Sequence, residues 1–197
     1  MAEKSAKPNK NQKLGRIISS PASGSRSGQM IALCRHSIVH HHFPQIARCL
    51  QMLTEEEIWW RPNEASNSVG NLVLHLAGNV RQWIISSLGG QLDTRRRDLE
   101  FAERGPLPRR ILLTHLRRTV SEADRVLATL TPRLLSSKHE IQGFRVSGLE
   151  AVTHVMEHLA FHAGQIVYVT KMKVRKDLGF TRLPRAKTPK VRVKSAP

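Results

Sequence analysis

The stretch Thr153–Ile166, THVMEHLAFHAGQI, holds three histidines, each four residues from the next: His154, His158 and His162. On an α-helix, a step of four residues turns the side-chain direction by only about 40°. The three imidazoles would therefore follow one narrow stripe, with neighbouring Cβ atoms about 5–6 Å apart. Two imidazoles at this spacing can bind one divalent metal ion from a single helix. The stretch predicts a helix with a stripe of histidines beside an apolar face.

Three interpretations of this stripe remain open. The histidines can be core residues that hydrogen-bond to their neighbours. The residues from His154 to His158 also spell H-x-x-E-H, a zinc-peptidase signature, but Glu157 would point away from the histidine stripe. The third interpretation is a metal site completed from another helix, since neutral imidazole suits zinc, nickel, copper and iron. Spacing alone does not choose between the pairs His154/His158 and His158/His162.

Length and cysteine content set the broad class of the protein. The 197 residues are enough for one domain with a full core. The sequence contains no apolar run near the length of a membrane-spanning helix and no signal-peptide pattern, so we expect no membrane partner. Cys34 and Cys49 are the two cysteines, and they predict free thiols in a reducing compartment, which we take to be the cytoplasm.

The net charge of +17 lies mainly at the two ends of the chain. Residues 1–28 carry +5 and residues 171–197 carry +9, which leaves +3 for residues 29–170. A basic fold would indicate nucleic acid as the main partner. Basic ends on a nearly neutral domain predict weak contact with nucleic acid at most, or simply solvated tails. We expect a disordered basic tail at 1–28, one domain at 29–180 and a flexible basic tail after it, at residues 181–197.

Apolar periodicity predicts four long helices, at residues 30–53, 65–88, 108–130 and 147–172. The link at 91–108 is long and charged, whereas antiparallel neighbours in a bundle need only about two to eight residues. This link therefore predicts a crossover, with the second and third helices roughly parallel. The pattern predicts an all-α protein, a four-helix bundle of the kind that holds metal sites between facing helices.

Local features inside these segments carry further predictions. Pro44 is expected to kink the first helix or to start its second half. Either Ser66 or Ser68 can cap the second helix. Residues 131–146 should be irregular, with short extended pieces on either side of Gly143.

His75 lies on the predicted inner face of the second helix, with Asn79 one turn later. A histidine where the pattern favours an apolar residue is either satisfied by a hydrogen bond or bound to a metal ion. On the fourth helix, Gly164 is expected to let another helix approach closely, and Gln165 to orient a ligand or bound solvent.

Two segments resemble the DinB-like superfamily, metal-binding helical bundles named after a DNA-damage-inducible bacterial protein. The segments are Asn67–Asn79, NSVGNLVLHLAGN, and His154–Ile166, in which H-x-x-x-H precedes AGQI. The phrase WWRPN, at Trp59–Asn63, is similar to one in a bacterial subgroup of unknown function. The resemblance covers about residues 43–180, and residues 1–42 depart from it.

The resemblance implies an up-down-down-up bundle that holds one divalent metal ion, with zinc or nickel expected. It implies three histidine ligands, one on the second helix and two on the fourth: His75, His158 and His162. His154 matches a position that is not usually a ligand, so we assign it, with Gln165 and Asn79, to the surroundings of the site.

Characterised DinB-like proteins include thiol-dependent S-transferases and isomerases. The resemblance therefore implies a metal-dependent transferase, acting in stress or detoxification on a low-molecular-weight thiol and an electrophilic substrate. One alternative is a metal-dependent hydrolase, since a bound metal can lower the pKa of water to about 7. Another is a non-catalytic metal-binding bundle whose basic tails contact nucleic acid. A homodimer is also left open.

Overall fold

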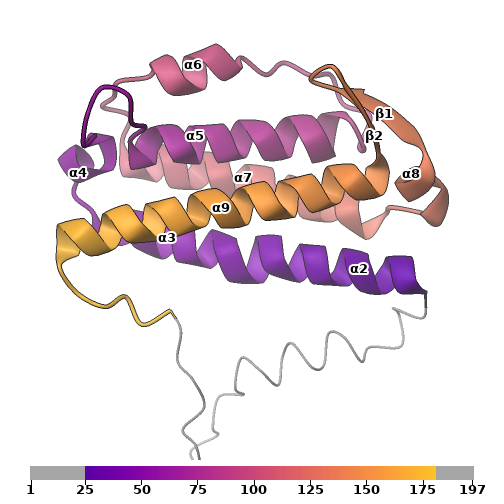
Figure 1. Ribbon diagram of the computed structural model, residues 1–197, viewed down its shortest axis with the longest axis horizontal. Coiled ribbons are helices and arrows are strands. Elements are labelled where there is room, and N and C mark those ends of the chain that lie inside the picture. The colour runs from indigo at the N-terminus through magenta and orange to yellow at the C-terminus, as the bar shows by residue number, and fades with distance from the viewer. Residues whose placement is uncertain (1–24, 181–197) are drawn as a thin grey trace, which may run out of the picture.

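The computed structural model describes residues 25–180, and these are mostly helical, as predicted (Figure 1). The predicted tails at 1–24 and 181–197 lie outside the described residues. Four long helical segments pack around one apolar core. The first comprises α2 (Arg26–Arg35), the π-helix η2 (His36–His42) and α3 (Phe43–Met52). The others are α5 (Val69–Val80) with the π-helix η3 (Arg81–Ser86), α7 (Arg109–Ala128) and α9 (Gly148–Val174).

The first helical segment begins earlier than predicted. Ser25 caps α2 by accepting a hydrogen bond from the Gly28 amide, so residues 26–28 belong to the helix and not to the tail. Pro44 follows the wider π-helical turn of η2 and lies in the first turn of α3. Proline has no N–H to donate to the preceding turn, and the wider turn lets the chain continue past this position without a break.

The second helical segment begins four residues later than predicted, because Ser68 rather than Ser66 caps it. The Ser68 hydroxyl accepts from the Asn71 amide, and the Asn71 side chain accepts in return from the Ser68 amide. This reciprocal pair satisfies two N–H groups at the start of α5. The cap fixes the position of the turn that carries His75.

A short hairpin connects α7 to α9. After α8 (Pro132–Ser136), the antiparallel strands β1 (Lys138–Ile141) and β2 (Phe144–Ser147) pair with Ile141 opposite Phe144. Their turn contains Gln142 and Gly143, both with positive φ. The predicted extended pieces are therefore present, and Ser147 then caps α9.

The link between the second and third helical segments contains a short helix, α6 (Arg97–Ala102), which lies against α5 (Figure 1). Trp59, at the end of α4 (Glu55–Trp59), holds this link in place. Its indole N–H donates to the Leu107 carbonyl at 3.2 Å. A Cβ on either Gly70 or Gly105 would lie within 3 Å of the Trp59 ring, so both glycines are needed for this close packing.

None of the helices in residues 25–180 combines the length and apolarity needed to cross a membrane. Cys34 and Cys49 are both buried free thiols, as expected for a reducing compartment. The cytoplasmic location stays a prediction.

Candidate metal centre

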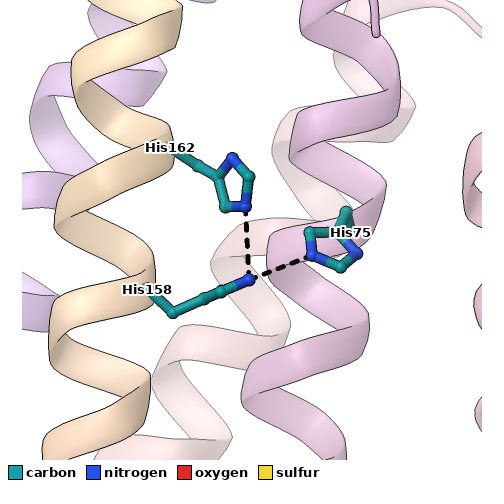
Figure 2. A group of neighbouring side chains, drawn as sticks. All are labelled: His75, His158 and His162. Atoms are coloured by element: carbon teal, nitrogen blue, oxygen red, sulfur yellow. Dashed lines mark hydrogen bonds between the residues drawn. The ribbon is translucent and has the colours of Figure 1, made fainter.

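Three imidazoles from two helical segments meet between α5 and α9 (Figure 2). His75 comes from α5, and His158 and His162 come from successive turns of α9. One ring nitrogen of each lies within 4.8 Å of the other two. The Nε2 atom of His158 is 3.0 Å from Nε2 of His75 and 3.2 Å from Nε2 of His162. The structure thus brings together the three residues expected as ligands.

The environment of His158 and His162 disfavours their protonated forms. Burial, followed by the neighbouring charges of His162 and His75, lowers the pKa of His158 to about 3. Burial also lowers the pKa of His162, although a hydrogen bond with Gln165 opposes the shift. His158 and His162 are therefore neutral near pH 7, which is the form that can bind a metal ion.

Neutral imidazoles satisfy this cluster only in part. Each neutral ring offers one N–H donor and one lone pair. Because Nε2 of His158 lies within hydrogen-bond distance of the other two Nε2 atoms, either one N–H is shared between two lone pairs or one lone pair is shared between two N–H donors. The Nδ1 atom of His158 is also buried, and it has no hydrogen-bond partner among the described residues. A cation at the convergence point would complete the donor set, so the residues fit a metal ion.

His154 lies one turn away from the three converging rings. Its ring lies against Trp83, tilted by 31° with centroids 4.0 Å apart, and its Nε2 is 3.4 Å from the Asn79 amide nitrogen. His154 and Asn79 thus lie beside the candidate site. Gln165 is placed at the other end, with its side-chain oxygen 2.6 Å from Nδ1 of His162. An amide oxygen accepts there, so Nδ1 carries the hydrogen and Nε2 of His162 is left with its lone pair.

The expectation for Gly164 was wrong. A Cβ built at this position meets nothing within 4 Å, and the residue is exposed. Ala163 and Ile166 face the core, and Gly164 lies on the opposite side of α9, which faces away from the other helices. Glu157 is exposed as well, and the peptidase interpretation of H-x-x-E-H finds no support.

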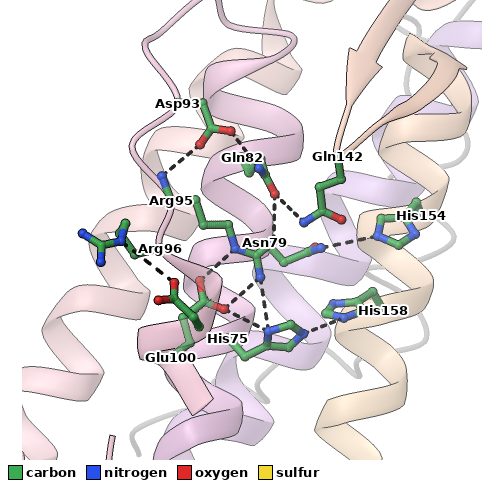
Figure 3. Close-up of polar contacts among 11 residues, drawn as sticks. His75, Asn79, Gln82, Asp93, Arg95, Arg96, Glu100, Gln142, His154 and His158 are labelled. Atoms are coloured by element: carbon green, nitrogen blue, oxygen red, sulfur yellow. Dashed lines mark hydrogen bonds and ion pairs between the residues drawn. The ribbon is translucent and has the colours of Figure 1, made fainter. Parts of the chain in front are cut away.

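Two residues of the site were missed in the sequence: Arg95 and Glu100, from the crossover (Figure 3). The Glu100 carboxylate is 3.0 Å from Nδ1 of His75, and Arg95 binds the same carboxylate at 2.8 and 2.9 Å. Burial alone would raise the pKa of Glu100, but hydrogen bonds from Arg95 and His75 outweigh it and lower that pKa. Helical periodicity gave no signal for either residue, because both lie in a charged link.

Comparison with known proteins identifies the family. Over residues 28–187, the sequence matches the family described as "Protein of unknown function (DUF1572)". The chain belongs to this family. No curated protein matches this DUF1572 member.

Solved structures establish the fold of this DUF1572 protein. A conserved protein from Enterococcus faecalis is 17% identical, with a TM-score of 0.62, covering 73% of this chain and 96% of that one. A DinB-like protein from Bacillus cereus is 14% identical, with a TM-score of 0.54, covering 68% and 87%. Another, from Bacillus subtilis, is 17% identical, with a TM-score of 0.53, covering 71% and 94%. At such identities the likeness concerns the fold alone, and it confirms the predicted DinB-like resemblance.

Proposed function

We propose that His75, His158 and His162 form a divalent-metal centre. The observation that carries the proposal is the convergence of their three Nε2 atoms, with spacings of 3.0 and 3.2 Å, which neutral imidazoles satisfy only in part because one hydrogen must serve two contacts. The low pKa of His158 supports it, because that ring stays available as a ligand near pH 7. Three nitrogen donors suit zinc or nickel, and they leave a coordination position open, as catalytic sites do.

The same proposal extends to thiol transfer. A divalent ion bound here would hold a low-molecular-weight thiol as thiolate, the nucleophilic form, facing a small electrophilic substrate. Glu100 contacts Nδ1 of His75, on the ring edge opposite Nε2, and is already paired with Arg95. It is therefore poorly placed to act as a general base at the open position. A thiol loses its proton on binding metal and needs no such base, whereas hydrolysis gains from one, so the arrangement favours a transferase over a hydrolase.

The proposal includes the up-down-down-up order of the four long helical segments. Arg35, in the first segment, hydrogen-bonds to Asp124, near the end of α7, at 2.7 Å. Arg109, at the start of α7, donates to the Leu50 carbonyl near the end of the first segment. These two contacts support an antiparallel first and third segment. The crossover through α6 supports a parallel second and third.

Metal content of single variants tests the centre. After extensive dialysis at neutral pH, His75→Ala, His158→Ala and His162→Ala should each lose most bound metal. His154→Ala should keep near-stoichiometric metal, with at most about a 10–100-fold loss of affinity. Protein purified without an affinity His-tag is needed for this measurement. A metal-free His154→Ala beside a loaded His162→Ala would move the site by one helical turn. Wild-type protein that neither carries metal nor gains stability from zinc or nickel would instead support core histidines.

Cobalt substitution tests the thiol step separately. Adding a small thiol to the cobalt-loaded protein should produce the intense near-ultraviolet absorption of a sulfur–cobalt bond. A cobalt-loaded protein whose spectrum is unchanged at saturating thiol would leave the metal centre in place and remove the transferase.

A further inference from the structure

One face of α5 and η3 is occupied by the crossover. Residues 71, 75, 78 and 82 follow one another at helical spacing on this face. The Asn71 side chain donates to the backbone carbonyls of Glu100 and Glu103, both at 2.9 Å. About three turns of helix are therefore in contact with the link, from Asp93, which accepts from the Gln82 side chain, to Glu103.

The Arg95–Glu100 ion pair is buried against this face (Figure 3). The exposed fractions of the two side chains are 3% and 11%. Arg95 is fixed further by Gln82, whose side-chain oxygen accepts from Nη1 at 2.9 Å. A Cβ on Gly78 would collide with Oε1 of Glu100 and lie 2.9 Å from Nε of Arg95. Glycine at this position makes room for the ion pair, one turn from His75.

Two groups compete for Nδ1 of His75, and they require opposite proton positions. Oε2 of Glu100 lies 3.0 Å away and can only accept, whereas Nη2 of Arg95 lies 3.2 Å away and can only donate. Arg95 Nη2 is nearer to Glu100 Oε2, at 2.9 Å. An ionised carboxylate is also the stronger acceptor of the arginine hydrogen. Nδ1 of His75 is thus left to donate to Glu100.

We propose that the Arg95–Glu100 ion pair fixes the tautomer of His75, so that the crossover positions a metal ligand as well as connecting two helices. With Nδ1 protonated, Nε2 of His75 presents its lone pair to His158. Both Arg95 and Glu100 are positioning residues, since neither touches the convergence point. The expected effect on metal affinity rests on the proposed metal centre. The tautomer of His75 is inferred from hydrogen bonds alone and does not rest on that centre.

The remaining protons of the cluster can be assigned consistently with this proposal. Gln165 fixes Nδ1–H of His162 in the same way that Glu100 fixes Nδ1–H of His75. Nε2 of His158 then carries the one hydrogen between the two lone pairs, at 3.0 and 3.2 Å. This leaves Nδ1 of His158 as a lone pair, which agrees with its lack of a partner among the described residues.

The tautomers can be measured in metal-free protein. Long-range proton–nitrogen spectra of ¹⁵N-histidine-labelled protein near pH 7.5, with chelator present, should show His75 protonated at Nδ1. In Glu100→Ala this preference should be lost, because the arginine hydrogen can then reach Nδ1. Finding His75 protonated at Nε2 in the wild type would overturn the proposal, whether or not any variant folds. If wild-type protein bound no metal but showed the Nδ1 tautomer, the metal centre would fall, and the inference that the ion pair fixes the His75 tautomer would stand.

Zinc affinity gives the second readout, measured by competition with a chromophoric chelator. Glu100→Ala should weaken binding about 10–100-fold, as loss of a partner that orients a ligand typically does. Glu100→Gln keeps an acceptor of similar size and should recover part of that loss. Glu122→Ala is the matched control, because it removes a partly buried ion pair between Glu122 of α7 and Arg81 of η3, which continues the helix that carries His75. Wild-type affinity in Glu100→Ala, or an equal loss in Glu122→Ala, would contradict the positioning role.

Discussion

His158 is the residue on which the candidate site depends most closely. It lies between the other two histidines and is within hydrogen-bond distance of both, yet its Nδ1 is buried without a partner among the described residues. His75 and His162 each have an acceptor at Nδ1. A buried polar atom without a partner costs about 1–3 kcal/mol, so this ring is held at the centre by its surroundings despite that cost.

The pKa of His158 gives a prediction for stability against pH. The pKa is about 3 in the folded protein, against an ordinary value of 6.5, so the unfolded chain binds more protons between these values. In the metal-free protein the free energy of unfolding should be constant above about pH 7 and should fall steadily as the pH drops from 6.5 toward 3. Each pKa unit corresponds to about 1.4 kcal/mol. The lowered pKa values of His154 and His162 add to the same trend.

Urea unfolding with chelator at pH 7.5, 6 and 5 measures this effect. Carboxylates whose pKa values are lowered, such as Glu100 and Glu150, titrate below that range and do not interfere. His158→Gln is the control, since it cannot be protonated and should flatten the pH dependence. An unfolding free energy in the wild type that is equal at pH 7.5 and 5 would contradict a buried neutral His158.

At the scale of elements, α5 is shaped by the crossover as much as by the core. Asn71 closes the capping box with Ser68 and also donates to the carbonyl of Glu100, in α6, and to that of Glu103, directly after it. Gly78 leaves the space that the Arg95–Glu100 pair fills. A helix interior would ordinarily favour alanine over glycine by about 0.5–1 kcal/mol. Position 78 nevertheless holds glycine, because an alanine side chain there would clash with the buried Arg95–Glu100 pair.

Gly78→Ala should therefore destabilise the protein, against the usual helix preference. The added methyl group would displace Glu100 and Arg95 from their contacts with His75 and Gln82, so we expect a loss of about 1–3 kcal/mol in urea unfolding. Gly164→Ala on α9 is the matched control. Its Cβ meets nothing within 4 Å, so it should stabilise by up to about 1 kcal/mol. Equal stabilisation by both substitutions would contradict this prediction, because it would show that the Arg95–Glu100 pair can move aside at little cost in free energy.

At the scale of the whole molecule, the sequence predicted what depends on periodicity and missed what depends on packing across the chain. The four long helices and His75 followed from apolar spacing, because the fold buries one face of each helix. Arg95 and Glu100 gave no such signal, since their burial comes from contact with α5 and not from a pattern of their own. Gly164 was misjudged because a glycine in a sequence does not show which helix face it occupies. Binding of a thiol, contact with nucleic acid and formation of a homodimer stay predictions.

The last prediction concerns the two ends of the chain. The segments 1–24 and 181–197 carry eleven of the 32 Lys and Arg residues and no apolar spacing that predicts packing. Deleting both should leave metal content and melting temperature almost unchanged. Ser25 must be kept, because a deletion through residue 28 also removes the cap and first turn of α2 and should cost about 0.5–2 kcal/mol.

The same two deletions test contact with nucleic acid. If DNA binds the full chain, its affinity should fall with salt, and the trimmed protein should show a flatter dependence, since each lost phosphate contact removes about 0.9 from the slope of log affinity against log salt. The trimmed protein, residues 25–180, should bind more weakly, because it keeps 21 Lys and Arg residues against 14 Asp and Glu residues, a net charge of +7 instead of +17. Tight, salt-insensitive binding by the trimmed protein would contradict this prediction and would place the interface on the helices. Arg117, Arg118 and Arg125, which are exposed on α7, would then contact nucleic acid instead of only solvent.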